Sequence, residues 1–485
     1  MNYKMMCRFF SLICLLEAIF LIPPLGIAIA WEKASTVLAF ALTLTVSLLL
    51  FFVFRLLSKG STAGAFRAKE GFVCVAASWI LLSLIGCLPF IISGEIPHFI
   101  DALFEIVSGF TTTGSSILSN VEALSKSLLY WRSFSNWVGG MGVLVFLLAL
   151  VPSGKKSEGF TMHLFRAESP GPEVGKLVPK MRQTAAVLYF TYILLTVAAF
   201  AFLVAGEMDI FEAVCTAFST AGTGGFGIKN DSFASFSPYI QNVCTVFMLL
   251  FGVNFSCYYL IFLRRIRSVF RDEELRLYIG IVVCSILLIT WNIASMYASV
   301  WDALRHSAFQ VASIISTCGF ASTNFDLWPA FSKGILMILM VTGACAGSTA
   351  GGMKCARILL LFKGLRRNIR KMLHPHEVQV IRVNERAVDE KTMANTNAYL
   401  SAYMVILFVS FLIVSLDNFS IGTNFTAVLS CFNNIGPGFE AVGPMANFAA
   451  YSPLSKIVLI FDMLAGRLEI FPMLLLFSGG VWKKN

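Results

Sequence analysis

The sequence predicts an all-α integral membrane protein, with two leading transmembrane helices and then four repeats of a long helix, a short helix and a second long helix. Three observations predict this fold class. The mean hydropathy is +0.78, and only 13% of the 485 residues are charged, where about 25% is usual in soluble domains. Ten apolar runs are long, and four shorter ones lie between them. This composition excludes a soluble enzyme, a disordered regulator and a nucleic-acid binder.

The ten long runs are the expected membrane spans, because a helix needs about 20 apolar residues to cross a bilayer. The first run follows Lys4 and Arg8 and resembles a secretory signal, but it is too long for one. We therefore expect a retained helix, interrupted at Pro23–Pro24. The expected spans are Phe9–Trp31, Thr36–Phe54, Val73–Ile92, Trp137–Val151, Ala185–Ala205, Tyr239–Leu263, Tyr278–Val300, Gly334–Met353, Ala398–Leu416 and Leu454–Phe477.

The four short apolar segments have about 10 to 13 residues, which is too few to cross a bilayer as a helix, so we expect them to be re-entrant. They are Ile100–Phe110, Ile210–Phe218, Ala303–Ile315 and Thr423–Phe432. The stretch before the polar end of each segment is also similar and begins with a phenylalanine: Phe104, Phe211, Phe309 and Phe425. The repeats divide the chain into the leading helices, 1–70, and four pore repeats, 71–155, 156–270, 271–372 and 373–485.

The distribution of basic residues predicts the topology. If the ten long runs cross and the N-terminus is cytoplasmic, 28 of the 37 Lys and Arg residues lie on the cytoplasmic side. This agrees with the positive-inside rule and places both termini inside. It also explains the net charge of +10 without a nucleic-acid partner.

Each short segment ends in a polar stretch that contains glycine. Irregular backbone at membrane depth is tolerated only where it is buried in protein or lines a wet pore, and four sets of backbone carbonyls around a central pore can replace the hydration shell of a potassium ion. One glycine could serve helix packing alone, but four in equivalent places favour a filter. The expected potassium ligands are backbone carbonyls of Thr111, Thr112, Thr113, Gly114, Thr223, Gly224, Gly225, Thr317, Cys318, Gly319, Asn434, Ile435 and Gly436.

With these segments the whole chain resembles the TrkH-type subunit of the Trk/Ktr/HKT potassium transporter superfamily. The residues that carry the resemblance are Thr111–Ser115 (TTTGS), Ser219–Gly227 (STAGTGGFG), Ser316–Phe320 (STCGF), Asn433–Gly438 (NNIGPG), Asn136–Gly142 (NWVGGMG), Ala346–Lys354 (AGSTAGGMK) and Gly466–Phe471 (GRLEIF). Cys318 departs from the small residue usual in the family, although its carbonyl is still available. In the second segment we align Gly225 with the other filter glycines, and a shift to Gly224 stays open.

A small-residue run, Gly343–Gly352, interrupts the second long helix of the third repeat. Such a run makes a poor helix, and close helix packing is the alternative reading. The resemblance implies an intramembrane gate, with Gly343, Gly347, Ser348, Thr349, Gly351 and Gly352. Lys354 either stabilises this loop or marks the cytoplasmic end of a helix. No G-x-x-x-x-G-K-[ST] motif occurs, so we expect no nucleotide binding by this chain.

Arg467 and Glu469 lie inside the last apolar run, and charges within a membrane are usually functional. Arg467 could form a structural ion pair with an acidic neighbour. The resemblance instead implies that it projects into the pore beneath the filter as part of the gate. Glu17 and Asp462 are further intramembrane acids, to which we assign no role.

The sequence therefore predicts a potassium-conducting membrane subunit rather than an enzyme, with potassium as transported ligand and no organic cofactor. A cation-coupled transporter of another small solute is the alternative, but it predicts inverted repeats. The basic segment Phe362–Asn397 could bind a soluble partner or anionic membrane lipid. The resemblance implies a homodimer in the cell membrane and a cytoplasmic ring of nucleotide-binding, TrkA-like regulatory subunits as separate chains.

Overall fold

The structure, a computed structural model, describes residues 3–59, 68–140, 142, 181–377 and 379–482. Within them the chain is almost wholly helical, and its two strands, β1 (Arg382–Val383) and β2 (Arg386–Ala387), form one small antiparallel hairpin. Short 3₁₀ turns lie in the connections: η1 (Val121–Ala123), η2 (Ala294–Met296), η3 (Phe325–Leu327), η4 (Ser415–Asp417) and η5 (Glu440–Val442). The expected all-α class is confirmed.

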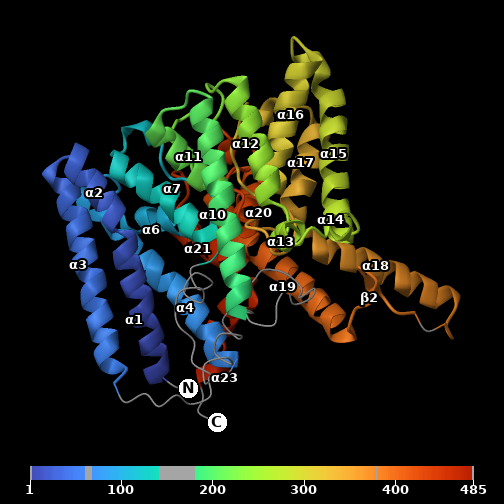
Figure 1. Ribbon diagram of the computed structural model, residues 1–485, viewed down its shortest axis with the longest axis horizontal. Helices are drawn as coiled ribbons and strands as arrows, with labels where there is room; N and C mark the ends of the chain where they lie inside the picture. The colour runs from blue at the N-terminus through green and yellow to red at the C-terminus, as the bar shows by residue number, and fades with distance from the viewer. Residues whose placement is uncertain (1–2, 60–67, 141, 143–180, 378, 483–485) are drawn as a thin grey trace.

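The leading helices form a pair on one flank of the molecule (Figure 1). They are α1 (Tyr3–Phe20) with its continuation α2 (Ile22–Trp31), and α3 (Ala34–Leu57). The break between α1 and α2 comes just before Pro23–Pro24, which occupy the first turn of α2, where proline is tolerated. The hydroxyl of Ser47 donates to the carbonyl of Cys14 at 2.7 Å, which ties α3 to α1.

Four groups of helices follow the leading pair, each with a short helix between longer ones. The first comprises α4 (Ala68–Gly86), α5 (Leu88–Ser93), α6 (Phe99–Phe110) and α7 (Lys126–Gly140). The second comprises α10 (Met181–Ala205), α11 (Ile210–Gly222), α12 (Pro238–Phe251) and α13 (Phe255–Phe262), with α14 (Ile266–Phe270) as connector. The third comprises α15 (Glu273–Ile293), α16 (Val300–Ile315), α17 (Ala330–Thr342) and α18 (Cys355–Leu373). The fourth comprises α19 (Glu390–Val414), α20 (Ile421–Asn433), α21 (Pro453–Arg467) and α22 (Phe471–Phe477), before α23 (Gly479–Trp482).

Several of the ten expected spans are broken helices in this structure, and the number of membrane crossings stays a prediction. Among the described residues, six helices are long and apolar enough to cross a membrane, and α12 with α13 makes a seventh bent by 88°. The runs Gly334–Met353 and Leu454–Phe477 are also broken, after Thr342 and after Arg467. Most of Trp137–Val151 lies outside the described residues. The break at Gly343 falls where the small-residue run was expected to interrupt the helix. The breaks at Gly252 and at Glu469–Ile470, two residues with left-handed backbone, were not expected.

Polar side chains cap three of the four short helices. Asp209 accepts from the Phe211 amide at the start of α11, Ser299 accepts from the Trp301 amide at α16, and Ser420 accepts from the Thr423 amide at α20. Such caps satisfy amides that a helix start leaves without intrahelical partners. These three helices therefore begin at defined points, whereas α6 follows His98 without a side-chain cap.

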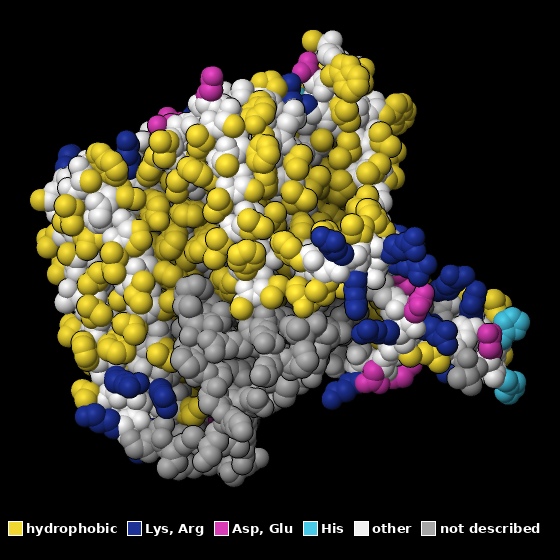
Figure 2. Space-filling view, viewed as in Figure 1, with side chains coloured by type: hydrophobic (Ala, Val, Ile, Leu, Met, Phe, Trp, Pro, Cys, Tyr) yellow, Lys and Arg dark blue, Asp and Glu magenta, His cyan; other side chains and the backbone are white. Residues whose placement is uncertain are grey.

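Charge is distributed unevenly along the molecule. Figure 2 shows a broad hydrophobic surface over the helices, with Lys and Arg gathered along α18 and at the lower end of the leading helices. The start of α1 and the last helix, α23, lie at this same lower end in Figure 1. The side of the membrane on which this end lies stays a prediction. The domain boundaries also stay predictions, and the one at 155/156 falls outside the described residues.

Candidate functional site

The four short helices end in the same hydrogen-bonded turn. After each helix, a residue with positive φ donates its amide to the carbonyl three residues back, and the next amide donates to the carbonyl five residues back. This is the Schellman pattern, which usually employs glycine at the left-handed position. Here the left-handed residues are Thr112 (φ 55°), Thr223 (53°), Thr317 (58°) and Asn434 (55°).

The glycine two residues after each left-handed residue also has positive φ, and this fixes the register of the repeats. These glycines are Gly114 (φ 80°), Gly225 (70°), Gly319 (87°) and Gly436 (104°). Gly224 is not among the residues with positive φ and corresponds instead to Thr113, Cys318 and Ile435. The structure therefore aligns Gly225 with the other three, without the shift to Gly224.

The four glycines form a closed ring. A Cβ built on Gly114 would overlap the carbonyl oxygen of Gly224, one on Gly225 would overlap that of Cys318, and one on Gly319 would overlap that of Ile435. A Cβ on Gly436 would lie 2.9 Å from the carbonyl oxygen of Thr113, which closes the circle. Each glycine thus faces the residue before the glycine of the next repeat, and only glycine combines this close approach with positive φ.

The four phenylalanines compared in the sequence do not all occupy equivalent positions in the structure. Phe104 and Phe309 lie ten residues before their glycines, but Phe211 and Phe425 do not. The shared residue is a serine six positions before each glycine, whose carbonyl accepts the Schellman hydrogen bond: Ser108, Ser219, Ser313 and Ser430. This serine is the sequence signal that the phenylalanine comparison missed.

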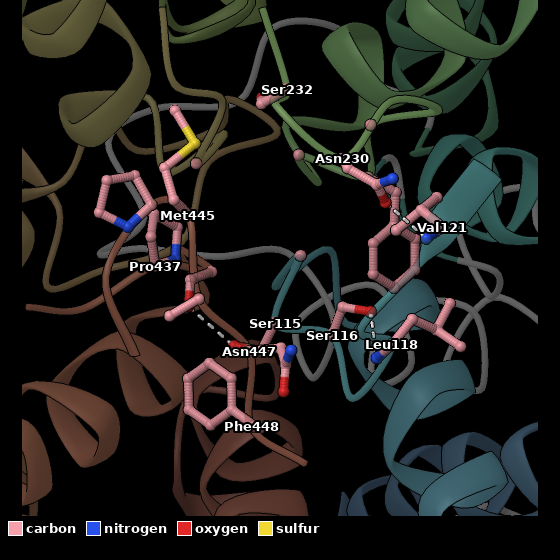
Figure 3. A pocket seen from close by; sticks show the side chains of 18 of the residues that line it. Ser115, Ser116, Leu118, Val121, Asn230, Ser232, Pro437, Met445, Asn447 and Phe448 are labelled. Atoms are coloured by element: carbon pink, nitrogen blue, oxygen red, sulfur yellow. Dashed lines mark hydrogen bonds between the residues drawn. The ribbon is translucent and has the colours of Figure 1, made fainter. Parts of the chain in front are cut away.

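The ring opens into a small polar cavity of about 130 Å³, which all four glycines line (Figure 3). Ser116 and Asn230 are among the side chains around it. The charged residues among those that line it are Arg132 and Lys229, so no described carboxylate lines this cavity. A cation that enters here would meet hydroxyl, amide and carbonyl dipoles and the two cationic side chains, but no carboxylate of a described lining residue.

Hydrogen bonds join neighbouring repeats around the cavity. Asn230 Oδ1 accepts from the Val121 amide at 2.7 Å (Figure 3), which joins the second repeat to the first. The Phe233 amide donates to the Ala321 carbonyl at 2.9 Å. Further bonds run from the Glu440 amide to Asp326 at 2.8 Å, and from the Phe448 amide to the Ser116 carbonyl at 2.9 Å. All four junctions between repeats are therefore bonded at this end.

A buried ion pair that sequence reasoning missed lies beside the first of the four glycine segments. Arg132 Nε donates to Glu105 at 2.8 Å, and the exposed fractions of the two side chains are 2% and 0%. Glu105 also accepts from the Ile117 amide at 3.0 Å. Arg132 donates to the Gly227 carbonyl at 3.3 Å and stacks on Phe226 at 4.1 Å. The pair thus connects the outer ends of the first and second segments. A carboxylate within the apolar segment Ile100–Phe110 was the available signal.

On the opposite side of the ring, residues 343–354 form a loop between α17 and α18. Gly343, Gly347 and Gly352 in this loop have φ of 64°, 69° and 74°. The Gly351 amide donates to Thr317 Oγ1 at 2.6 Å, and a Cβ on Gly351 would overlap the carbonyl oxygen of Asn433. The loop therefore lies directly against the third and fourth glycine segments.

Arg467 connects this loop to the first repeat. It ends α21, and its guanidinium donates to the Thr349 carbonyl at 2.9 Å, to the Gly140 carbonyl at 2.6 Å and to the Gly139 carbonyl. Gly139 and Gly466 occupy equivalent places, since a Cβ on either would overlap the carbonyl four residues before its own filter glycine. The following residue is Gly140 in the first repeat and Arg467 in the fourth, so of these two repeats only the fourth carries a cation at this position.

The neighbouring charges have defined partners. Glu469 pairs with Arg357 of α18, and Arg357 stacks on Tyr399 at 3.9 Å. Lys354 is buried and donates to the Ala350 carbonyl within the loop, at the N-cap position of α18, so it belongs to both the loop and a helix end. Ser348 donates to the Cys345 carbonyl at 2.6 Å.

Two further acids, Asp462 and Glu17, are fully buried. Asp462 accepts from Ser410 at 2.7 Å. Glu17 is fully buried and faces Gly86 of α4.

The chain is similar over its length to proteins of one family. The TrkH family model, described as cation transport protein, matches residues 39–484. A Trk system potassium uptake protein TrkH from Salmonella typhimurium is 37% identical over 434 residues, 87% of each chain. The protein of that name from Halomonas elongata is 31% identical over the full length of both chains. The crystal structure of the potassium transporter TrkH from Vibrio parahaemolyticus matches all of both chains, with a TM-score of 0.86 and 30% sequence identity.

Proposed function

Because the chain belongs to the TrkH family of cation transport proteins, we propose that it is the potassium-conducting membrane subunit of a Trk-type uptake system. The observation that carries this proposal is the closed ring of Gly114, Gly225, Gly319 and Gly436. Four equivalent backbone segments around one axis can replace the water around a potassium ion with carbonyl oxygens.

In this proposal the ions bind to backbone carbonyls of the thirteen expected filter residues: Thr111, Thr112, Thr113, Gly114, Thr223, Gly224, Gly225, Thr317, Cys318, Gly319, Asn434, Ile435 and Gly436. The C-terminal ends of α6, α11, α16 and α20 point partial negative charge at the ring. This arrangement favours a cation without any carboxylate, which agrees with the cavity lining. The Gly436 carbonyl also accepts from Ser115 at 2.9 Å, which holds its orientation.

The gate in this proposal is the loop 343–354 together with Arg467. The loop contacts the filter at Thr317, and Arg467 spans from the loop to the end of α7. A guanidinium at this position places a fixed positive charge beneath the filter. This charge strongly repels a permeating cation where water is scarce. Ion flow then requires that the loop and Arg467 move aside.

The family also supports proposals about assembly and placement. We place the subunit in the cell membrane as a homodimer with both termini cytoplasmic, in contact with a cytoplasmic ring of nucleotide-binding regulatory chains. The support is that relatives are named as parts of a Trk system, and that Lys and Arg gather along α18 and at the lower end of the leading helices, where the start of α1 and α23 lie.

Rubidium uptake into proteoliposomes that contain this chain tests the proposal. We expect potassium to compete with rubidium and sodium to compete weakly. Gly319→Ser should abolish this preference, because its Cβ would overlap the Ile435 carbonyl. Gly334→Ser, in open space on α17, is the matched control and should keep it. If both variants retain the wild-type preference, the ring is not the filter.

A further inference from the structure

One buried carboxylate holds both ends of the loop beneath the ring. Glu274, in the first turn of α15, is 7% exposed. Its Oε1 accepts from the Ala346 amide at 2.6 Å and from the Ala356 amide at 3.1 Å. Ala346 lies within the loop, and Ala356 lies in the first turn of α18. A single oxygen atom therefore sets the separation between the two ends of this loop.

The residues next to Glu274 are bound by the β1–β2 hairpin. Asn384, in its two-residue turn, accepts from the Glu273 amide at 2.9 Å through Oδ1 and donates to Asp272 at 2.7 Å through Nδ2. Its own amide donates to Glu273 at 3.1 Å. Asp272 is also the N-cap of α15 and accepts from the Leu275 amide at 2.9 Å. The hairpin thus fixes the start of the helix that carries Glu274.

Helix α18 contacts both the start of α15 and the hairpin. Lys363 pairs with Glu273 and donates to the Arg382 carbonyl at 2.6 Å. The hairpin therefore contacts α18, which directly follows the loop, at Lys363. It also contacts the start of α15, the helix that carries Glu274, at Asp272 and Glu273. The hairpin lies beside α18, outside the helical bundle (Figure 1).

We propose that Glu274 is a positioning residue of the gate, and that the hairpin 382–387 latches it in the closed arrangement. This inference rests on the proposed role of loop 343–354 as the gate. Hydrogen bonds to a carboxylate are stronger than those to neutral acceptors. When the hairpin moves away from the N-terminal end of α15, Glu274 is no longer held in position. The loop can then adopt open conformations. A regulatory contact at the hairpin would act on ion flow by this route.

The variants separate the latch from general damage. Glu274→Ala removes both bonds to the loop, and Glu274→Gln keeps a weaker acceptor of the same length. Asn384→Gly removes the side-chain bonds to Asp272 and Glu273 while it tolerates φ of 51°. Glu385→Gly is its matched control, since Glu385 is the exposed neighbour in the same turn with φ of 64°. Glu390→Ala, which breaks the exposed pair with Arg367, controls for lost charge at this surface.

Two measurements test the proposal: hydrogen exchange of residues 344–357, and rubidium flux through the chain reconstituted alone. Glu274→Ala and Asn384→Gly should both accelerate exchange in 344–357 and raise the flux about tenfold, within the usual range of coupling between sites. Glu274→Gln should give smaller increases, and the potassium preference should persist. Glu385→Gly and Glu390→Ala should match wild type.

Arg467→Ala provides the benchmark for the gate itself. If it raises flux while Asn384→Gly and Glu385→Gly behave alike in both measurements, the latch is wrong and the gate stands. If Asn384→Gly accelerates exchange in 344–357 but neither it nor Arg467→Ala changes flux, the loop is coupled to the hairpin but is not the gate, and both proposals fail.

Discussion

The Gly351 amide lies 2.6 Å from the Thr317 hydroxyl and donates a hydrogen bond to it. Thr317 is the left-handed residue of the third filter segment, and Gly351 belongs to the loop beneath the ring. The proposed filter and the proposed gate are therefore directly bonded, with no intervening side chain from another element. Movement of the loop must break this bond.

Thr317→Val should weaken the closed arrangement. The change keeps the side-chain shape but leaves the buried Gly351 amide without its acceptor, which costs about 1–3 kcal/mol. We expect increased rubidium flux through the chain reconstituted alone. Thr317→Ser retains the hydroxyl and should behave as wild type. Equal fluxes for the two variants would contradict a role of this bond in closure.

The register of the second segment is tested by rescue. A Cβ on Gly225 would overlap backbone, at Cys318, whereas one on Gly224 would overlap the side chain of Asn136. Both Gly225→Ala and Gly224→Ala should reduce potassium preference over sodium in competition assays. Asn136→Ala makes room only at Gly224, so it should restore the preference of Gly224→Ala and leave Gly225→Ala impaired. Rescue of both variants, or of Gly225→Ala alone, would refute the register.

Replacement of Arg467 by lysine should only partly preserve the closed state. Its guanidinium reaches carbonyls of the loop and of α7 together, whereas an ammonium is a compact point charge that cannot span them in the same way. Arg467→Ala should raise rubidium flux most, and Arg467→Lys should give an intermediate value. A lysine variant as tightly closed as wild type would show that charge alone suffices.

The Arg132–Glu105 pair should stabilise the fold and the filter together. Removal of one partner leaves a buried charge unpaired, at a cost of about 3–5 kcal/mol. Glu105→Ala should therefore lower the thermal midpoint in detergent and reduce potassium preference. The double variant Glu105→Gln/Arg132→Met removes both charges and should recover much of the midpoint. A single variant as stable as wild type would contradict this role.

Glu440 gives a pH dependence outside the membrane-spanning helices. Hydrogen bonds from Ser420 and Thr423 hold the pKa of its carboxyl below the usual 4.5. A lowered pKa adds stability above the unfolded value, and this stability is lost as pH falls through the folded value. Hydrogen exchange around residues 420–442 should therefore be constant from pH 8 to 5, after correction for intrinsic rates, and accelerate below pH 4. Glu440→Gln should remove this transition.

The sequence predicts the helical class, the four short segments and their filter glycines because hydropathy and glycine position are local signals. It does not predict the break in α12–α13, where Gly252 ends the first helix and Asn254 caps the second within a mainly apolar run. The comparison of Phe211 with Phe104 was wrong, because Phe211 lies about one helical turn further from its glycine, Gly225, than Phe104 lies from Gly114.

Contacts between distant segments were beyond sequence reasoning. Glu105 and Arg132 lie 27 residues apart, and Glu274 lies 72 residues from Ala346. Nothing in either local pattern specifies a partner. Arg467 could be singled out by its charge in an apolar run, but its three carbonyl acceptors come from two other repeats and required the fold.

The most direct test of the filter is the location of a bound cation. Crystals of the protein soaked in thallium, which substitutes for potassium and scatters anomalously, should show anomalous density on the axis of the ring formed by Gly114, Gly225, Gly319 and Gly436. Excess potassium should remove this density, and equal sodium should leave it. Thallium bound elsewhere in the membrane region, with none at the ring, would contradict the filter.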